Sequence, residues 1–181
     1  YKEDFIAATM STELTNTSKL REFVEELKRL KVEMIRPSIN KCFAEFKAET
    51  NKISYGLGAI KNVGFEAISN IVNEREKNGK FISIIDFINR VSSKDVNKLQ
   101  LEGLVKAGAF DSLEINRQSL FNSIPSFIMK SKNIFENKSY NQIDLFAETE
   151  NDNNNILSNT EDWKFEERLS KEFEAVGFFI S

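Results

Sequence analysis

The residues of this chain best suited to bind a ligand form the turn Lys61-Asn62-Val63-Gly64. Apolar residues recur at helical spacing from Ala67 to Val72, which predicts a helix that begins just after the turn. The first amides of a helix have no acceptor within the helix and lie at the positive end of its dipole. They favour an anion such as a phosphate group, and the Lys61 side chain would add a positive charge beside them.

The residue types of the turn agree with a tight hairpin. Gly64 can adopt a positive φ and lets another group approach its backbone closely, and an asparagine such as Asn62 tolerates the left-handed region well. With the apolar run that ends at Ile60, the pattern predicts helix, hairpin, helix. It resembles the DNA-binding helix-hairpin-helix motif, which usually has a glycine where Asn62 stands. An αα-hairpin that only packs is the alternative. The DNA-binding residues that the resemblance implies are Gly58, Lys61, Asn62, Val63 and Gly64.

The chain repeats this pattern in a more degenerate form. The amphipathic segment 97–105 ends in Lys106-Ala107-Gly108, and Asn116 then opens another apolar segment that contains Pro125. We expect the proline to kink or interrupt that helix. Helix-hairpin-helix units commonly occur in pairs, so the resemblance implies a second phosphate contact at Lys106, Ala107 and Gly108.

A short apolar island stands between two polar segments, 130–141 and 147–162, whose composition predicts a flexible linker. The island, Gln142 to Phe146, either folds back onto the helical core or docks on a partner. Its spacing resembles the Gln-x-x-Leu-Phe peptide that binds the bacterial sliding clamp. This resemblance implies that the clamp-binding residues are Gln142, Asp144, Leu145 and Phe146.

Composition excludes several kinds of site. The chain has no histidine and one cysteine, Cys42, which excludes Cys/His zinc sites, Cys-His nucleophiles and disulfides within the chain. No apolar run approaches the roughly 20 residues of a membrane span. The net charge is −3, but segment 52–108 has nine basic and six acidic residues, whereas segment 147–175 has three basic and nine acidic. We therefore expect the hairpin to be electropositive, with the acidic segment elsewhere and phosphate binding weak and salt-sensitive.

The remaining elements predict a mainly α fold with a small β-hairpin. Segments 43–47 and 53–55 flank a turn and form the β-hairpin, 32–35 is a further strand candidate, and 175–180 predicts a strand at the end of the chain. We expect four parts. They are residues 1–41, the β-hairpin with tandem helix-hairpin-helix units at 42–130, the flexible clamp-binding linker at 131–162, and a helix and strand at 163–181.

Taken in order, these features resemble the C-family of bacterial replicative DNA polymerases, the DNA polymerase III alpha subunits. The similar stretches are Gly56 to Gly64, Leu104 to Asp111, Gln142 to Phe146 and Val176 to Ser181, and the match covers nearly the whole chain. It implies a fragment, in keeping with the absence of an initiator methionine, that runs from the end of the fingers to the start of an OB-fold.

The resemblance also implies a division of labour. The parent would be a DNA-directed DNA polymerase that needs Mg²⁺, located in the bacterial cytoplasm and at the nucleoid during replication. The fragment itself would lack catalytic residues, cofactors and metal sites. Its implied partners are double-stranded DNA, the sliding clamp and other polymerase subunits, with no membrane.

Three other functions compete with this interpretation. A helix-hairpin-helix DNA glycosylase would need a catalytic aspartate near Asp86, but the spacing of Ser83 and Asp86 already predicts an N-terminal helix cap. A scaffold that binds no nucleic acid is the second. A dinucleotide site at Gly56 and Gly58 is disfavoured because Lys61 occupies the place of the third glycine.

Overall fold

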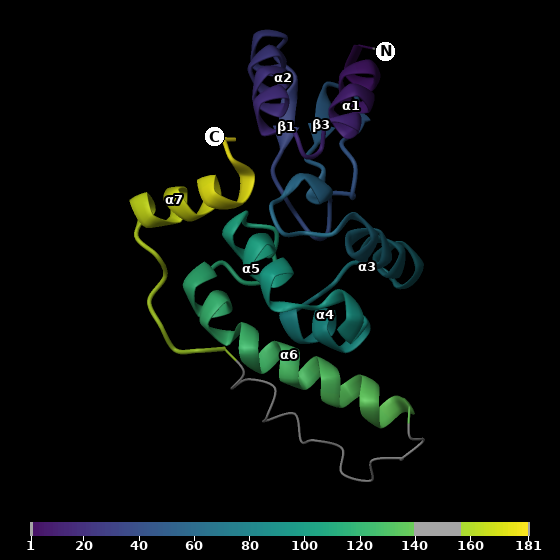
Figure 1. The fold of residues 1–181 in the computed structure, drawn as a ribbon, viewed down its shortest axis with the longest axis vertical. Helices are drawn as coiled ribbons and strands as arrows, with labels where there is room; N and C mark the ends of the chain where they lie inside the picture. The colour runs from purple at the N-terminus through teal and green to yellow at the C-terminus, as the bar shows by residue number, and fades with distance from the viewer. Residues whose placement is uncertain (1, 140–156, 181) are drawn as a thin grey trace.

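The computed structural model describes residues 2–139 and 157–180 and confirms the mainly helical fold (Figure 1). In chain order, the elements are α1 (Lys2–Thr12), α2 (Thr17–Arg29), β1 (Glu33–Ile35), β2 (Lys47–Glu49), β3 (Lys52–Ser54), the 3-10 helix η1 (Leu57–Ala59), α3 (Phe65–Asn78), α4 (Ile84–Arg90), the 3-10 helix η2 (Ser93–Asp95), α5 (Lys98–Lys106), α6 (Arg117–Ser139) and α7 (Phe165–Val176).

The strands form one small sheet in the order β1-β3-β2. Strands β2 and β3 pair antiparallel, which confirms the predicted β-hairpin, and Asn51 has a positive φ of 58° in its turn. Strand β1 pairs parallel to β3, with Met34 opposite Ile53. Helices α1 and α2 stand beside this sheet at one end of the molecule, and α3 to α6 form the other end (Figure 1).

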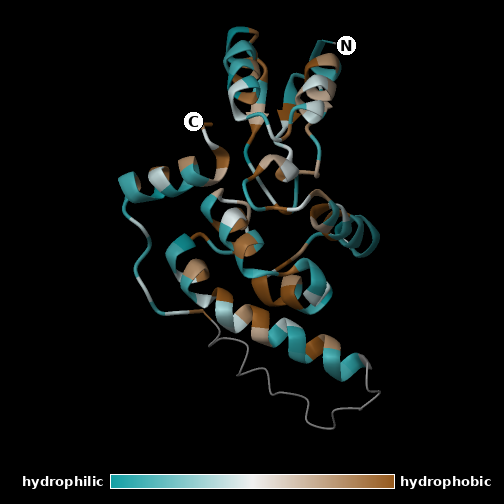
Figure 2. Ribbon diagram, viewed as in Figure 1, coloured by the Kyte–Doolittle hydropathy of each residue, from teal (hydrophilic) through white to brown (hydrophobic). Residues whose placement is uncertain are grey.

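A continuous apolar core joins the two ends. Hydrophobic residues colour the ribbon brown mostly where the helices of the lower half face one another, and hydrophilic residues colour their outer turns teal (Figure 2). Phe87 packs edge-on between Phe81 and Phe110, with 5.0 Å between ring centroids in each pair. Tyr55 is fully buried beside Phe46. This core holds α3, α4, α5 and α6 around the two predicted hairpins.

Three helices begin at a side-chain cap, and the one at Ser83 confirms the predicted cap. The side chains of Asn16, Ser83 and Asn97 each accept a hydrogen bond from the amide three residues later, as N-caps do. These caps fix the beginnings of α2, α4 and α5.

The second half of the chain differs from expectation in three places. Helix α6 contains Pro125 without interruption and continues to Ser139, so residues 131–139, which we expected in the flexible linker, are helical. Residues 157–162 lie along α6, where Ser119 Oγ donates to the Ser158 carbonyl at 2.5 Å. The expected strand at 175–180 is absent from the described residues, because α7 runs to Val176 and ends at Gly177 with a φ of +89°. A side chain at that position would meet Thr17.

Candidate phosphate-binding site

The first hairpin has the predicted turn but a shorter first helix. Asn62 adopts the left-handed conformation with φ +65°, and the Val63 amide closes the turn on the Ile60 carbonyl at 3.2 Å. The expected helix before the turn is wrong, since only η1, one turn of 3-10 helix, stands there. Lys61 and Asn62 are exposed and Val63 is buried. The turn therefore exposes Lys61 and Asn62 to solvent, while the buried side chain of Val63 holds it against the core.

Gly64 does not serve the turn as predicted. Its φ of −77° lies in the extended region that any residue adopts, so the expected positive φ is wrong. Its amide donates to the buried Gln100 side chain at 3.1 Å. The next amides, from Phe65 to Ala67, begin α3, where no acceptor within the helix is available. A phosphate at this hairpin would use those amides, next to the carboxylate of Glu66 in the same turn.

Two glycines let other backbone segments approach the hairpin. A Cβ on Gly58 would lie 2.9 Å from the Ala44 carbonyl oxygen and 3.1 Å from the Phe65 ring. A Cβ on Gly103, in α5, would lie 2.7 Å from the Lys61 carbonyl oxygen. Gly58 was a predicted DNA contact, and the structure places it in packing contact with Ala44 and Phe65. Gly103 was missed by sequence reasoning, and only its small size within a helical pattern marks it.

The second hairpin is a helix C-terminus rather than an open turn. Gly108 has a φ of +80°, and the Ala109 amide donates back to the Leu104 carbonyl at 3.0 Å. Ala107 is buried. The Lys106 ammonium lies 3.1 Å from the Glu174 carboxylate of α7, and its side chain is only 20% exposed. The expectation that the acidic segment lies away from the hairpins is therefore wrong.

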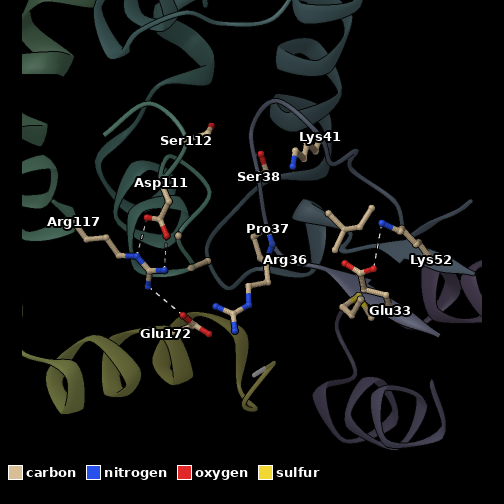
Figure 3. Close-up of a pocket in the computed structure, with 14 residues that line it drawn as sticks. Glu33, Arg36, Pro37, Ser38, Lys41, Lys52, Asp111, Ser112, Arg117 and Glu172 are labelled. Carbon is tan, nitrogen blue, oxygen red and sulfur yellow. Dashed lines mark hydrogen bonds and ion pairs between the residues drawn. The ribbon is translucent and has the colours of Figure 1, made fainter. Parts of the chain in front are cut away.

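Arg117 fills the second hairpin from within (Figure 3). Its guanidinium forms two hydrogen bonds to Asp111, at 2.9 and 2.7 Å, and one to Glu172 of α7, at 3.1 Å. It also donates to the Lys106 carbonyl at 3.2 Å. Burial alone would lower the pKa of this guanidinium, but the hydrogen bonds to the two carboxylates outweigh burial and raise the pKa above its usual value. A side chain on Gly108 would overlap the guanidinium.

Helix α7 thus contacts both hairpins. Besides Glu172 and Glu174, the Ala175 carbonyl accepts a hydrogen bond from the Lys61 amide at 2.9 Å. Sequence reasoning treated α7 only as an amphipathic helix, because nothing in its own residues identifies its partners.

A cleft of about 460 Å³ opens between the second hairpin and the loop after β1 (Figure 3). Arg36, Ser38 and Lys41 line one wall, and Ser112 and Arg117 line the other. Sequence reasoning missed this cleft because its walls are about 70 residues apart in the chain, and no short-range pattern joins them.

Asp86 has structural partners. Its carboxylate accepts hydrogen bonds from the Ile82 amide and from Arg90, both at 3.0 Å, and its amide donates to Ser83 Oγ at 3.0 Å. These contacts confirm the predicted cap. The clamp-binding residues Gln142, Asp144, Leu145 and Phe146 lie outside the described residues.

Comparison with known proteins places these features in a family context. A family model described as a helix-hairpin-helix motif matches residues 31–120. The chain is 38% identical over its full length to DNA polymerase III subunit alpha of Borreliella burgdorferi, and 35% identical over 98% of its length to that of Caulobacter vibrioides. It is 33% identical over its full length to the same subunit of Campylobacter jejuni. The chain spans 16% of the length of each of these relatives. None of the helices in the described part of the chain has the length and apolar character needed to cross a bilayer.

Proposed function

Because the chain belongs to the DNA polymerase III alpha subunit family as one segment of such a protein, we propose that it grips duplex DNA without reading sequence and ties the polymerase to its sliding clamp. The whole protein is then a DNA-directed DNA polymerase that uses Mg²⁺ in another part of its chain. In this proposal it works with other polymerase subunits in the bacterial cytoplasm. In this proposal, the segment itself has no catalytic role.

The first hairpin is the feature that carries the DNA-binding proposal. Lys61 is exposed, and within the described residues its ammonium forms no ion pair. The amides that open α3 follow directly after the turn. Contacts of this kind bind phosphate oxygens, and they position a protein on a duplex without carrying sequence information.

Lys61→Gln tests this proposal by fluorescence anisotropy with two duplexes of unrelated sequence. Loss of one phosphate contact lowers the slope of log K against log salt by about 0.9, and we expect equal weakening on both duplexes. Lys28→Gln is the matched control, because Lys28 is an exposed lysine on α2, away from the hairpins, and its ion-pair partner in the described part of the chain is Glu25 at 3.5 Å. An unchanged salt slope in Lys61→Gln would remove the hairpin from the DNA interface.

The second hairpin remains a proposed contact of a different kind. A phosphate at Lys106, Ala107 and Gly108 would have to displace the Glu174 carboxylate from the lysine. We therefore expect Lys106→Gln to lower the salt slope less than Lys61→Gln.

The clamp proposal rests on sequence and family. Leu145 and Phe146 would fill an apolar pocket on the clamp, each contributing about 1.5–3 kcal/mol when fully buried, and Gln142 would fix the register of the peptide. Two weak contacts, one to DNA and one to the clamp, strengthen each other through effective concentration.

A titration against the bacterial sliding clamp tests the tether separately. Leu145→Ala with Phe146→Ala should abolish clamp binding and leave duplex binding intact. Ile143→Ala, a similar apolar truncation at a variable position of the peptide pattern, should bind the clamp like the unaltered chain. Equal clamp affinity in all three proteins would refute the tether.

A further inference from the structure

The cleft between the second hairpin and the loop after β1 has an imbalance of charge. Every carboxylate that lines it already has a basic partner. Asp111 and Glu172 pair with Arg117, and Glu33 pairs with Lys52 at 3.2 Å. By contrast, the side chains of Arg36 and Lys41 form no hydrogen bond or ion pair with any residue that the structure describes. Because Arg117 serves two of the carboxylates, the lining side chains carry four positive and three negative charges, and Arg36 and Lys41 are the two basic residues without an ion pair among the described residues.

The loop that carries these charges is held rigidly. The Ile39 amide donates to the Ala109 carbonyl at 2.8 Å, and the side chain of Asn40 exchanges two hydrogen bonds with the Phe81 backbone, at 2.8 and 2.9 Å. The guanidinium of Arg75, only 4% exposed, donates to the carbonyls of Ile39 and Cys42 at 3.0 and 2.6 Å. A ligand would therefore order only side chains and not the backbone, which keeps the entropic cost of binding low.

The donors come from two walls of the cleft. Figure 3 shows the Arg36 side chain extending from its loop toward Glu172, whereas Ser112 lies at the other end of the cleft. Ser38 and Lys41 follow on the same loop. The Ser38 oxygen accepts from the Asn40 amide at 3.3 Å, which leaves its hydroxyl hydrogen free to donate.

We propose that this cleft binds phosphate groups, one at Arg36 and another at Lys41 with hydroxyl donors from Ser38 and Ser112. A tetrahedral phosphate has several acceptor oxygens that donors on two walls can share, and the planar arginine fork suits such an anion. A volume of about 460 Å³ admits more than one phosphate group. The groups belong either to a DNA strand, in which case the site rests on the proposed function and extends it, or to a small phosphate compound.

Arg36→Gln with Lys41→Gln, in the 181-residue chain, tests the site. Both side chains are exposed, so the fold should survive, and thermal unfolding checks this. Lys28→Gln with Arg29→Gln is the matched control, because it removes the same charge from the exposed face of α2.

The first readout is the binding of inorganic phosphate and pyrophosphate, followed by ¹⁵N chemical shifts. We expect saturable shifts at the Ser112 amide in the unaltered chain and in the control, and their loss in the cleft variant. The Arg36 side chain, present only in the first two proteins, should shift in both. The second is duplex binding, where each lost contact lowers the salt slope by about 0.9. A drop in both assays identifies DNA as the source of the phosphate, and a drop in the first alone identifies a small phosphate compound. Unchanged behaviour in both overturns the site.

The experiments distinguish a failure of the cleft proposal from a failure of the proposed function. If Lys61→Gln weakens duplex binding while the cleft variant behaves like its control in both assays, the hairpin stands and the cleft does not. If the unaltered chain binds no duplex, the proposed function fails, and the phosphate titration alone decides the cleft.

Discussion

Replacing Arg117 by methionine should weaken the packing of α7 against the second hairpin. Methionine keeps most of the length of the side chain and removes its charge. The Arg117 side chain is 5% exposed, and Glu172, one of its partners, is 9% exposed. Within the described residues, Arg117 is the only hydrogen-bond or ion-pair partner of the Glu172 carboxylate.

The cost follows from what the substitution leaves behind. Removing one member of a buried ion pair typically costs about 3–5 kcal/mol, because the other charge stays buried without a partner. The energetic cost at Asp111 is smaller, because its side chain is 33% exposed and keeps its ion pair with Arg168 at 3.4 Å. Most of the destabilisation therefore comes from Glu172 and the Lys106 carbonyl, which lose their hydrogen bonds from Arg117. We therefore expect a loss near the lower limit, about 3 kcal/mol of unfolding free energy, or roughly a hundredfold in the folding equilibrium.

Urea unfolding measures this loss, with the fluorescence of the single tryptophan, Trp163, and circular dichroism as two probes. The double variant Arg117→Met with Glu172→Leu should recover most of the stability, because replacing a whole buried pair by apolar groups is often neutral. Arg29→Met is the control. Its pair with Glu26, at 3.3 Å, is solvent-exposed, so its change should stay within about 1 kcal/mol.

Two results would refute this reasoning. A loss below about 1 kcal/mol in Arg117→Met would mean that Glu172 is solvated and α7 is not docked. A double variant as unstable as the single one would mean that the packing of the arginine, and not its charge, holds the helix.

Two further predictions concern the same contacts. Gly103→Ala should destabilise the chain by about 1 kcal/mol, because overpacking against the Lys61 carbonyl costs about 1–3 kcal/mol and the helical alanine restores about 1. A more stable variant in urea unfolding would contradict it. The hydrogen bond from Lys106 lowers the pKa of Glu174 below its usual 4.5, and burial opposes this shift without cancelling it. Stability from the pair is therefore present above pH 4.5 and lost as the pH falls through the lowered pKa. Glu174→Gln should remove this loss from the urea midpoints, and an unchanged pH dependence would show that the pair does not contribute.

Features that depend on neighbouring residues could be predicted from the sequence. The left-handed Asn62, the cap between Ser83 and Asp86, and the β-hairpin around Asn51 each follow from residue types within a few positions. Their energetics are local, since a cap or a turn is satisfied by its own segment.

Features that depend on residues far away in the chain could not be predicted from the sequence. The Gly64 amide is occupied by Gln100, 36 residues away, and the Lys106 ammonium by Glu174, 68 residues away. The apolar run at the end of the chain predicted a strand, but burial of residues such as Phe178 against the core supplies the same apolar signal without one. Periodicity reports which residues are buried, and only the fold decides what covers them.

The contacts of α7 determine how the acidic residues of this chain affect its two hairpins. By composition, the acidic segment opposes phosphate binding, yet in the structure its carboxylates lie on the second hairpin and its Ala175 carbonyl braces the Lys61 amide of the first. The second hairpin is therefore neutralised internally, while the Lys61 side chain stays exposed to solvent. The two hairpins are not equivalent in this arrangement. One packs against α7 through Arg117, and the other, fixed in place by that assembly, is the one that we propose binds a duplex.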